Sequence, residues 1–201
     1  MDKKDKYRCI RIIGWSCALF FILSGITIGI VWLNRPAYIV PDTSQWKTGD
    51  IFFSVGDSWE SVAVRTLTGF NSFELSDSTP SHCGVVIRLD GDVKLVHEST
   101  LAKNIVIETP EEYLKNNGSY CLYARKPPCL LDNKALLQAI DSLIVRKVPF
   151  DFDFDHSSSE SLYCTELVIK VFEICGYSGF SGLREQSYIY PTDILNLCDT
   201  L

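Results

Sequence analysis

The sequence predicts an α+β domain, an antiparallel sheet packed against helices, with a membrane-spanning helix before it. Short apolar runs separated by turn signals come first in the domain, and amphipathic helical patterns follow them. This order is typical of α+β proteins with antiparallel sheets. Near the N-terminus, residues 12–33 form a run of 22 residues without a charge, which is long enough to cross a bilayer.

The uncharged run 12–33 is predicted to be a transmembrane anchor between a basic tail, 1–11, and a linker, 34–47. As a helix rising about 1.5 Å per residue, it would be about 33 Å long. Five lysines and arginines precede the run, whereas only Arg35 closely follows it. The positive-inside rule therefore predicts a cytoplasmic N-terminus and a periplasmic or extracellular domain.

A cleaved signal peptide is the alternative to the anchor. The run is longer than the usual apolar region of a signal peptide, and no small-x-small cleavage site stands clearly at its end. We therefore predict a single-pass protein that contacts the bacterial membrane through residues 12–33.

Residues 48–201 are expected to form one domain, long enough to bury a core. The strands are expected at 51–55, 84–89, 93–98, 104–108 and 120–124, and the helices at 59–68, 133–145 and 164–175, with short helices opening at Pro110 and Pro191.

Turn and cap residues set these boundaries. Asp90-Gly91 is a strong hairpin signal between two of the strands. Pro110 suits the first turn of a helix, and Gly176 suits the position just after one. The segment 150–155, which alternates aromatic and acidic residues, is expected to line a substrate cleft, or otherwise to be a turn in which Asp151 caps the backbone.

Charge and cysteine spacing exclude several classes of function. The net charge is −6 despite the basic tail, and no stripe of lysine and arginine is present to bind phosphates. Nucleic-acid binding is therefore disfavoured. The eight cysteines include no Cys-x-x-Cys pair, so neither a zinc knuckle nor a redox motif is indicated. No metal or cofactor is predicted, although some cysteines could pair in an oxidising compartment.

Cys164 is the main candidate for chemistry. It begins a predicted helix, where the positive end of the helix dipole favours thiolate over thiol. It also lies at the edge of the apolar stripe of that helix, so a small core side chain is the alternative interpretation.

His82 is the candidate base. It stands directly before an apolar strand, where its imidazole could take the proton of a thiol at a helix start. Either His97 or Glu98 could orient this imidazole. Successive strand residues face opposite sides, so only one of the two shares the face of His82, and the sequence does not decide which.

These residues belong to five blocks that resemble a known family when taken in order. The blocks are Gly49 to Phe53, Ser81 to Val86, Val96 to Ser99, Pro149 to Asp151 and Tyr163 to Val168. The set resembles the circularly permuted branch of the NlpC-type papain-like hydrolases, the YiiX-like (YiiX/YebB-like) proteins. The histidine of this branch precedes its cysteine, the reverse of the usual papain-like order.

The resemblance implies a permuted papain-like fold and a membrane-anchored cysteine hydrolase. It implies Cys164 as nucleophile, His82 as general base and Glu98 as the residue that orients His82, with His97 as second choice. Such an enzyme cleaves an amide or ester bond through a thioester. The substrate would be a peptide, peptidoglycan or an N-acyl or lipid-like acyl amide.

Two other interpretations remain open. The first is a membrane-anchored binding module of the same fold without turnover. The second is a metal site built from His82, Cys83, His97 and Cys164, which we rank last because adjacent strand residues do not readily point to one ion.

Overall fold

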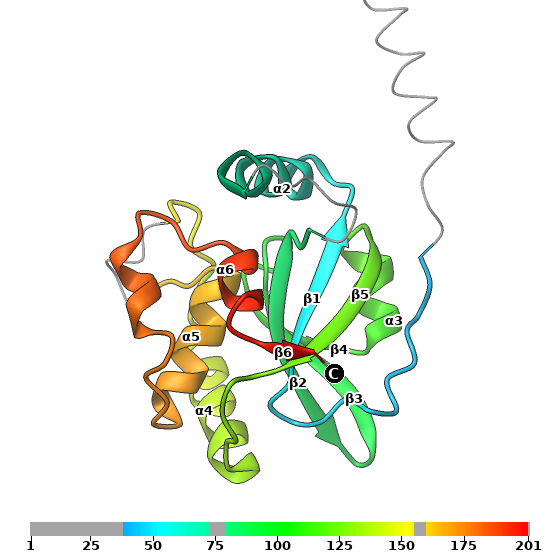
Figure 1. The fold of residues 1–201 in the computed structure, drawn as a ribbon. Helices are drawn as coiled ribbons and strands as arrows, with labels where there is room; N and C mark the ends of the chain where they lie inside the picture. The colour runs from blue at the N-terminus through cyan, green and yellow to red at the C-terminus, as the bar shows by residue number, and fades with distance from the viewer. Residues whose placement is uncertain (1–37, 73–78, 155–159, 201) are drawn as a thin grey trace, which may run out of the picture. The chain divides into compact units, whose positions relative to one another are not determined.

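The structure is a computed structural model that describes residues 38–72, 79–154 and 160–200. Its sheet has the strand order β4-β3-β2-β1-β5-β6, and all neighbouring strands are antiparallel (Figure 1). The strands are β1 (Ile51–Gly56), β2 (His82–Leu89), β3 (Asp92–Ser99), β4 (Asn104–Glu108), β5 (Ser119–Lys126) and β6 (Asp199–Thr200). The helices are α2 (Trp59–Ser72), α3 (Pro110–Asn116), α4 (Asn133–Val145), α5 (Cys164–Ile174), α6 (Pro191–Leu195) and the 3₁₀ helix η1 (Ser181–Glu185).

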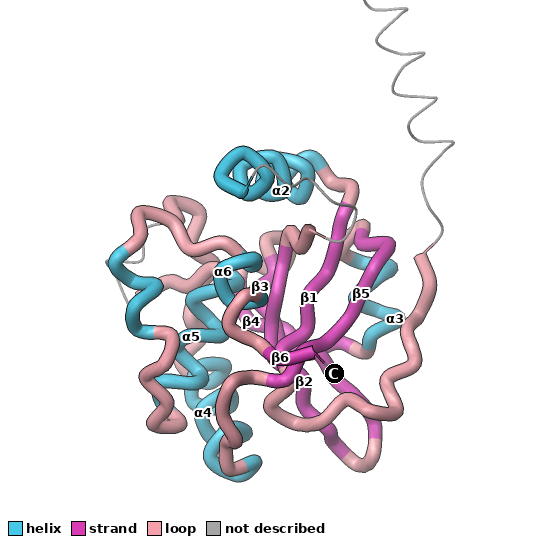
Figure 2. The backbone as a smooth tube through the Cα atoms, in the orientation of Figure 1, coloured by secondary structure: helices cyan, strands magenta, loops and turns pink. Residues whose placement is uncertain are grey.

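Helices cover both faces of the sheet: α4 and α5 pack on one face, and α3 packs on the other (Figure 2). The alternation of side chains along β2 serves both faces. Cys83 and Val85 join the core under α5, and Val86 joins the core beside α3. Because successive strand residues point to opposite faces, β1, β2 and β3 each contribute to both cores.

Local sequence explains where the helices begin and end. The Thr109 side chain accepts a hydrogen bond from the Glu112 amide, and the Glu112 carboxylate accepts one from the Thr109 amide, so a capping box opens α3. Asp132 caps α4 through the Ala135 amide. Gly176 follows α5 with a φ of +86°, a conformation that glycine adopts without strain.

The predicted α+β class with an antiparallel sheet is confirmed. Strand 104–108 and helix 133–145 have the predicted bounds. The second strand was expected to begin at Gly84, but it begins at His82. The reason is that His82 pairs with Ser54 of β1. His82 is therefore held within the sheet instead of in a loop before it.

The predicted anchor, 12–33, lies outside the described residues. Among the residues that the structure describes, no helix is long and apolar enough to cross a membrane.

Gly84 is needed where the Phe52 side chain crosses β2. A Cβ atom built at Gly84 would lie 2.4 Å from the Val96 carbonyl oxygen and 2.5 Å from the Phe52 ring. The backbone oxygen cannot move without disturbing the β2–β3 ladder. We therefore predict that Gly84→Ala lowers the free energy of unfolding by about 3 kcal/mol, measured by urea denaturation. Gly182→Ala is the control, because a Cβ there meets nothing within 4 Å; equal losses in both variants would contradict the prediction.

Candidate functional site

Cys164 is the first residue of α5, held at the sheet by the apolar face of that helix. Leu167, Val168 and Phe172 of α5 are fully buried against the sheet. Before the helix, Tyr163 is extended, and its amide donates a hydrogen bond of 3.2 Å to Glu166 Oε2. The half-buried Cys164 thiol thus lies at the positive end of a helix dipole.

Two neighbours favour the thiolate of Cys164. A hydrogen bond from the Cys83 thiol, followed by the charge and hydrogen bond of His82, holds the pKa of Cys164 well below its ordinary value. The Cys83 side chain is fully buried, which raises the pKa of its own thiol, so Cys83 keeps its proton. Cys83 is therefore a hydrogen-bond donor to the Cys164 thiolate.

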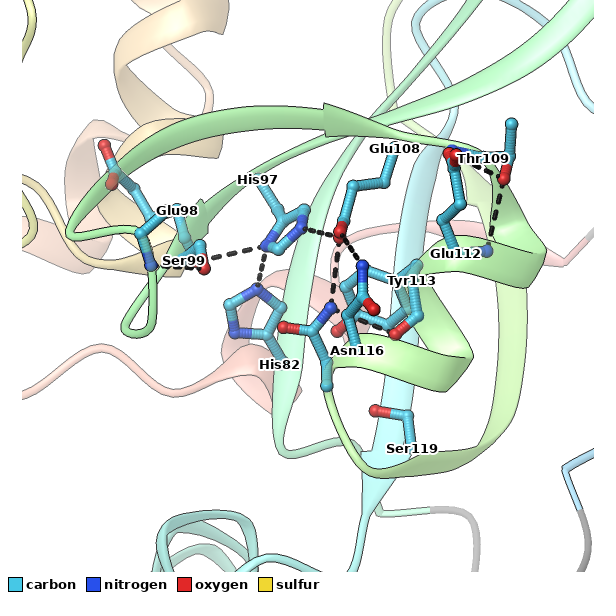
Figure 3. A network of polar contacts seen from close by, with 12 residues as sticks. His82, His97, Glu98, Ser99, Glu108, Thr109, Glu112, Tyr113, Asn116 and Ser119 are labelled. Carbon is cyan, nitrogen blue, oxygen red and sulfur yellow. Dashed lines mark hydrogen bonds and ion pairs between the residues drawn. The ribbon is translucent and has the colours of Figure 1, made fainter.

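His82, the first residue of β2, contacts His97 of β3. His82 Nε2 lies 3.3 Å from His97 Nδ1, and the two rings meet edge-on with their centroids 5.2 Å apart (Figure 3). The His82 ring also stacks on Tyr113 of α3 at a centroid distance of 6.1 Å. His82 therefore has partners on two sides: the Cys164 thiol and the buried His97.

The structure brings His97 to His82, and does not bring Glu98 there. The Glu98 side chain points away from His82 (Figure 3), and neither of its oxygens has a hydrogen-bond partner among the described residues. The pleat of β3 is the reason, since it sends consecutive side chains to opposite faces. The sequence predicted Glu98 as the first choice for the residue that contacts His82 and His97 as the second. In the structure His97 makes this contact.

Glu98 is instead a buried carboxyl on the α5 side of the sheet. Burial, and then the negative charges of Cys164 and Glu166, raise the pKa of Glu98 to about 8. Glu98 is fully buried and protonated at neutral pH.

Sequence reasoning missed Glu108, the last residue of β4. Its Oε2 lies 2.9 Å from His97 Nε2 and 3.1 Å from Asn117 Nδ2, and its Oε1 accepts a hydrogen bond of 2.6 Å from Asn116. The hydrogen bond from His97 is the largest cause that lowers the pKa of Glu108 to about 2, whereas burial lowers the pKa of His97. The signal that would have found Glu108 is the β3–β4 register. Leu95 pairs with Glu108, which puts Glu108 on the face of His97.

Two exposed aromatic side chains, Phe152 and Phe154, precede Cys164 along the chain. Phe152 and Phe154 are 57% and 41% exposed, and Phe154 packs against Tyr163 at a centroid distance of 5.5 Å. Phe154 has a φ of +54°, a strained conformation for an aromatic residue. Asp151 Oδ1 accepts a hydrogen bond from the Asp153 amide, as expected for a turn.

The side chains of the site do not form a metal centre. Among the described residues, no group of three or more histidine, cysteine, aspartate or glutamate side chains could hold a metal ion. His82 and His97 share a hydrogen bond, so these two nitrogens do not point to a common ion.

The raised pKa of Glu98 predicts a pH-dependent cost to stability. Between pH 4.5, the ordinary pKa, and about 8, the folded state keeps a proton that the unfolded state releases. The free energy of unfolding therefore falls as the pH rises through this window. We predict that Glu98→Gln removes this loss. The difference in free energy of unfolding between Glu98→Gln and the wild type should shift by about 2–4 kcal/mol in favour of the variant between pH 4.5 and pH 9.

Urea denaturation across this pH range measures the effect, with Glu111→Gln, an exposed glutamate of α3, as the control. Stability curves that stay parallel for the wild type and Glu98→Gln would show that Glu98 is ionised in the folded state.

Comparison with known proteins gives a structural relative. No protein-family model and no curated protein matches the sequence. Among solved structures, the fold matches YiiX from Escherichia coli O157:H7, described as a metalloprotein of DUF1105. The match has a TM-score of 0.54 and 16% sequence identity, and it covers 83% of this chain and 97% of YiiX. The chain therefore has the fold of YiiX, and the predicted resemblance to the YiiX-like proteins is confirmed for the fold.

Proposed function

We propose that the domain is a cysteine hydrolase that cleaves an amide or ester bond, with Cys164 as nucleophile, His82 as general base and His97 as the group that orients His82. One observation carries the proposal: a single imidazole, His82, interacts with a thiol of lowered pKa on one side and with a buried imidazole on the other. The YiiX-like fold is consistent with a permuted papain-like hydrolase.

The proposed reaction uses each contact of His82. Its Nε2 is engaged by His97, so Nδ1 is the nitrogen that takes the Cys164 proton. The thiolate attacks the carbonyl carbon, and the imidazolium then protonates the leaving amine or alcohol. The backbone amides at the start of α5 would stabilise the oxyanion, and water would hydrolyse the thioester.

The surroundings of Cys164 support two candidate classes of substrate. The exposed rings of Phe152 and Phe154 favour an apolar group, as in an N-acyl or lipid-like amide, and a cell-envelope peptide is the other candidate. The uncharged run 12–33 supports membrane anchoring, with the domain outside the cytoplasm.

A catalytically inactive binding module of the same fold is the alternative. The contact between His82 and His97 and the lowered pKa of Cys164 favour the enzyme, since binding alone requires neither. The description of YiiX as a metalloprotein raises a metal site as another candidate, but the side chains here do not fit one.

The thiolate of Cys164 predicts selective alkylation. We predict that iodoacetamide modifies Cys164 faster than Cys129 at neutral pH, with a lower pH midpoint, because burial raises the pKa of Cys129. Peptide mass spectrometry measures both rates in the same protein. His82→Ala and Cys83→Ala are each expected to move the Cys164 midpoint upward while leaving that of Cys129 unchanged.

Acylation separates the enzyme from the binding module. With p-nitrophenyl acetate as the probe, intact-mass spectrometry should show an acyl group on Cys164 that is subsequently lost. We expect His82→Ala to slow this turnover about 10²–10⁴-fold and Cys164→Ala to abolish it. A Cys164 that reacts no faster than Cys129, and that His82→Ala leaves unchanged, would overturn the proposed hydrolase.

A further inference from the structure

The contact between His82 and His97 can serve catalysis with only one arrangement of protons. A neutral imidazole carries one N–H and one acceptor nitrogen. For His82 to take the thiol proton at Nδ1, its Nε2 must carry a hydrogen, and the Nδ1 of His97 must then accept it. His97 must therefore carry its own hydrogen on Nε2.

One neighbour of His97, the backbone oxygen of Glu98, disfavours this arrangement of protons. His97 Nδ1 lies 3.1 Å from the backbone oxygen of Glu98, which can only accept a hydrogen bond. This oxygen favours a hydrogen on Nδ1. That hydrogen would face His82 Nε2 and leave His82 with its N–H toward Cys164, the wrong tautomer for a base.

Glu108 lies at the other nitrogen of the His97 ring, where it favours a hydrogen on Nε2 and so competes with the Glu98 carbonyl. Its carboxylate accepts hydrogen bonds from His97, Asn116 and Asn117, and its pKa of about 2 keeps it ionised. An ionised carboxylate accepts only, and its charge-assisted bond is stronger than one to a neutral carbonyl. The His97 side chain is 1% exposed, and its burial disfavours a doubly protonated ring that would satisfy both oxygens.

We propose that Glu108 is a positioning residue that fixes His97 as the Nε2–H tautomer and thereby directs the free Nδ1 of His82 toward Cys164. The role in catalysis rests on the proposed hydrolase, whereas the tautomer of His97 does not. Glu108 touches neither substrate nor the reacting atoms, and no proton leaves His97.

The titratable groups around His97 are few. Among the described residues, its ring contacts His82, Glu108 and Tyr113, and burial raises the pKa of Tyr113, so the phenol stays protonated. Of these three groups, Glu108 is therefore the one that carries a negative charge at neutral pH.

The test is the tautomer of His97, read by ¹⁵N NMR of imidazole nitrogens in the full-length protein purified in detergent. The wild type is expected to show the neutral Nε2–H form. In Glu108→Leu, which lacks an acceptor, His97 is expected to change to the Nδ1–H form. Glu108→Gln retains one oxygen and is expected to show a mixture of the two His97 tautomers. This variant replaces Glu108→Leu in the test if the leucine variant does not fold. Glu111→Gln, an exposed glutamate of α3, is the control and should match the wild type.

Reactivity gives the second readout. We expect Glu108→Leu to raise the pH midpoint of Cys164 alkylation and to slow acylation by p-nitrophenyl acetate at least about tenfold. Wild-type His97 in the Nδ1–H or doubly protonated form, or an unchanged tautomer in Glu108→Leu, would overturn the role of Glu108. If the tautomer follows Glu108 while Cys164 proves unreactive in the wild type, the tautomer assignment stands and the proposed hydrolase fails, taking with it the catalytic consequence.

Discussion

The pleat of β3 divides the site into two chemical environments, and the rest of the arrangement depends on this division. His97 and Glu98 are adjacent in sequence, yet one side chain lies on the α3 side of the sheet and the other on the α5 side. Since a shift by one residue would exchange these faces, the register of β3 against β2 and β4 fixes which group can reach His82. The pairs Val85–Val96 and Leu95–Glu108 set this register.

The two carboxyl groups near the site show how environment decides ionisation. Glu108 accepts three hydrogen bonds, and its pKa is lowered to about 2, whereas Glu98 has no hydrogen-bond partner among the described residues, and its pKa is raised to about 8. An ionised Glu98 would stand beside the Cys164 thiolate and oppose its formation, so a neutral carboxyl on that side favours the thiolate. An ionised Glu108 lies behind His97, with its Oε2 2.9 Å from His97 Nε2.

The sequence predicted the elements better than their contacts. Strand 104–108 and helix 133–145 could be predicted because their signals are local: apolar periodicity, an aspartate cap and turn residues. Cys164 and His82 could be proposed because each stands at the end of an element. The choice between His97 and Glu98 could not be made, because the alternation of β3 has two phases and the sequence does not say which phase faces His82. Glu108 escaped notice because its partner, His97, is reached only across the β3–β4 ladder, and an acidic residue at a strand end resembles an ordinary exposed position.

The order of residues along the chain matters little to such a site, because the sheet and α5 position its members independently. His82 is placed by pairing with β1, His97 by pairing with β2 and β4, and Cys164 by the apolar face of α5. None of these placements requires the cysteine to precede the histidine. The arrangement therefore depends on the strand register and the start of α5, and not on which of Cys164 and His82 comes first along the chain. The register carries the greater constraint, because one slipped residue would put Glu98 in place of His97 and remove Glu108 from reach.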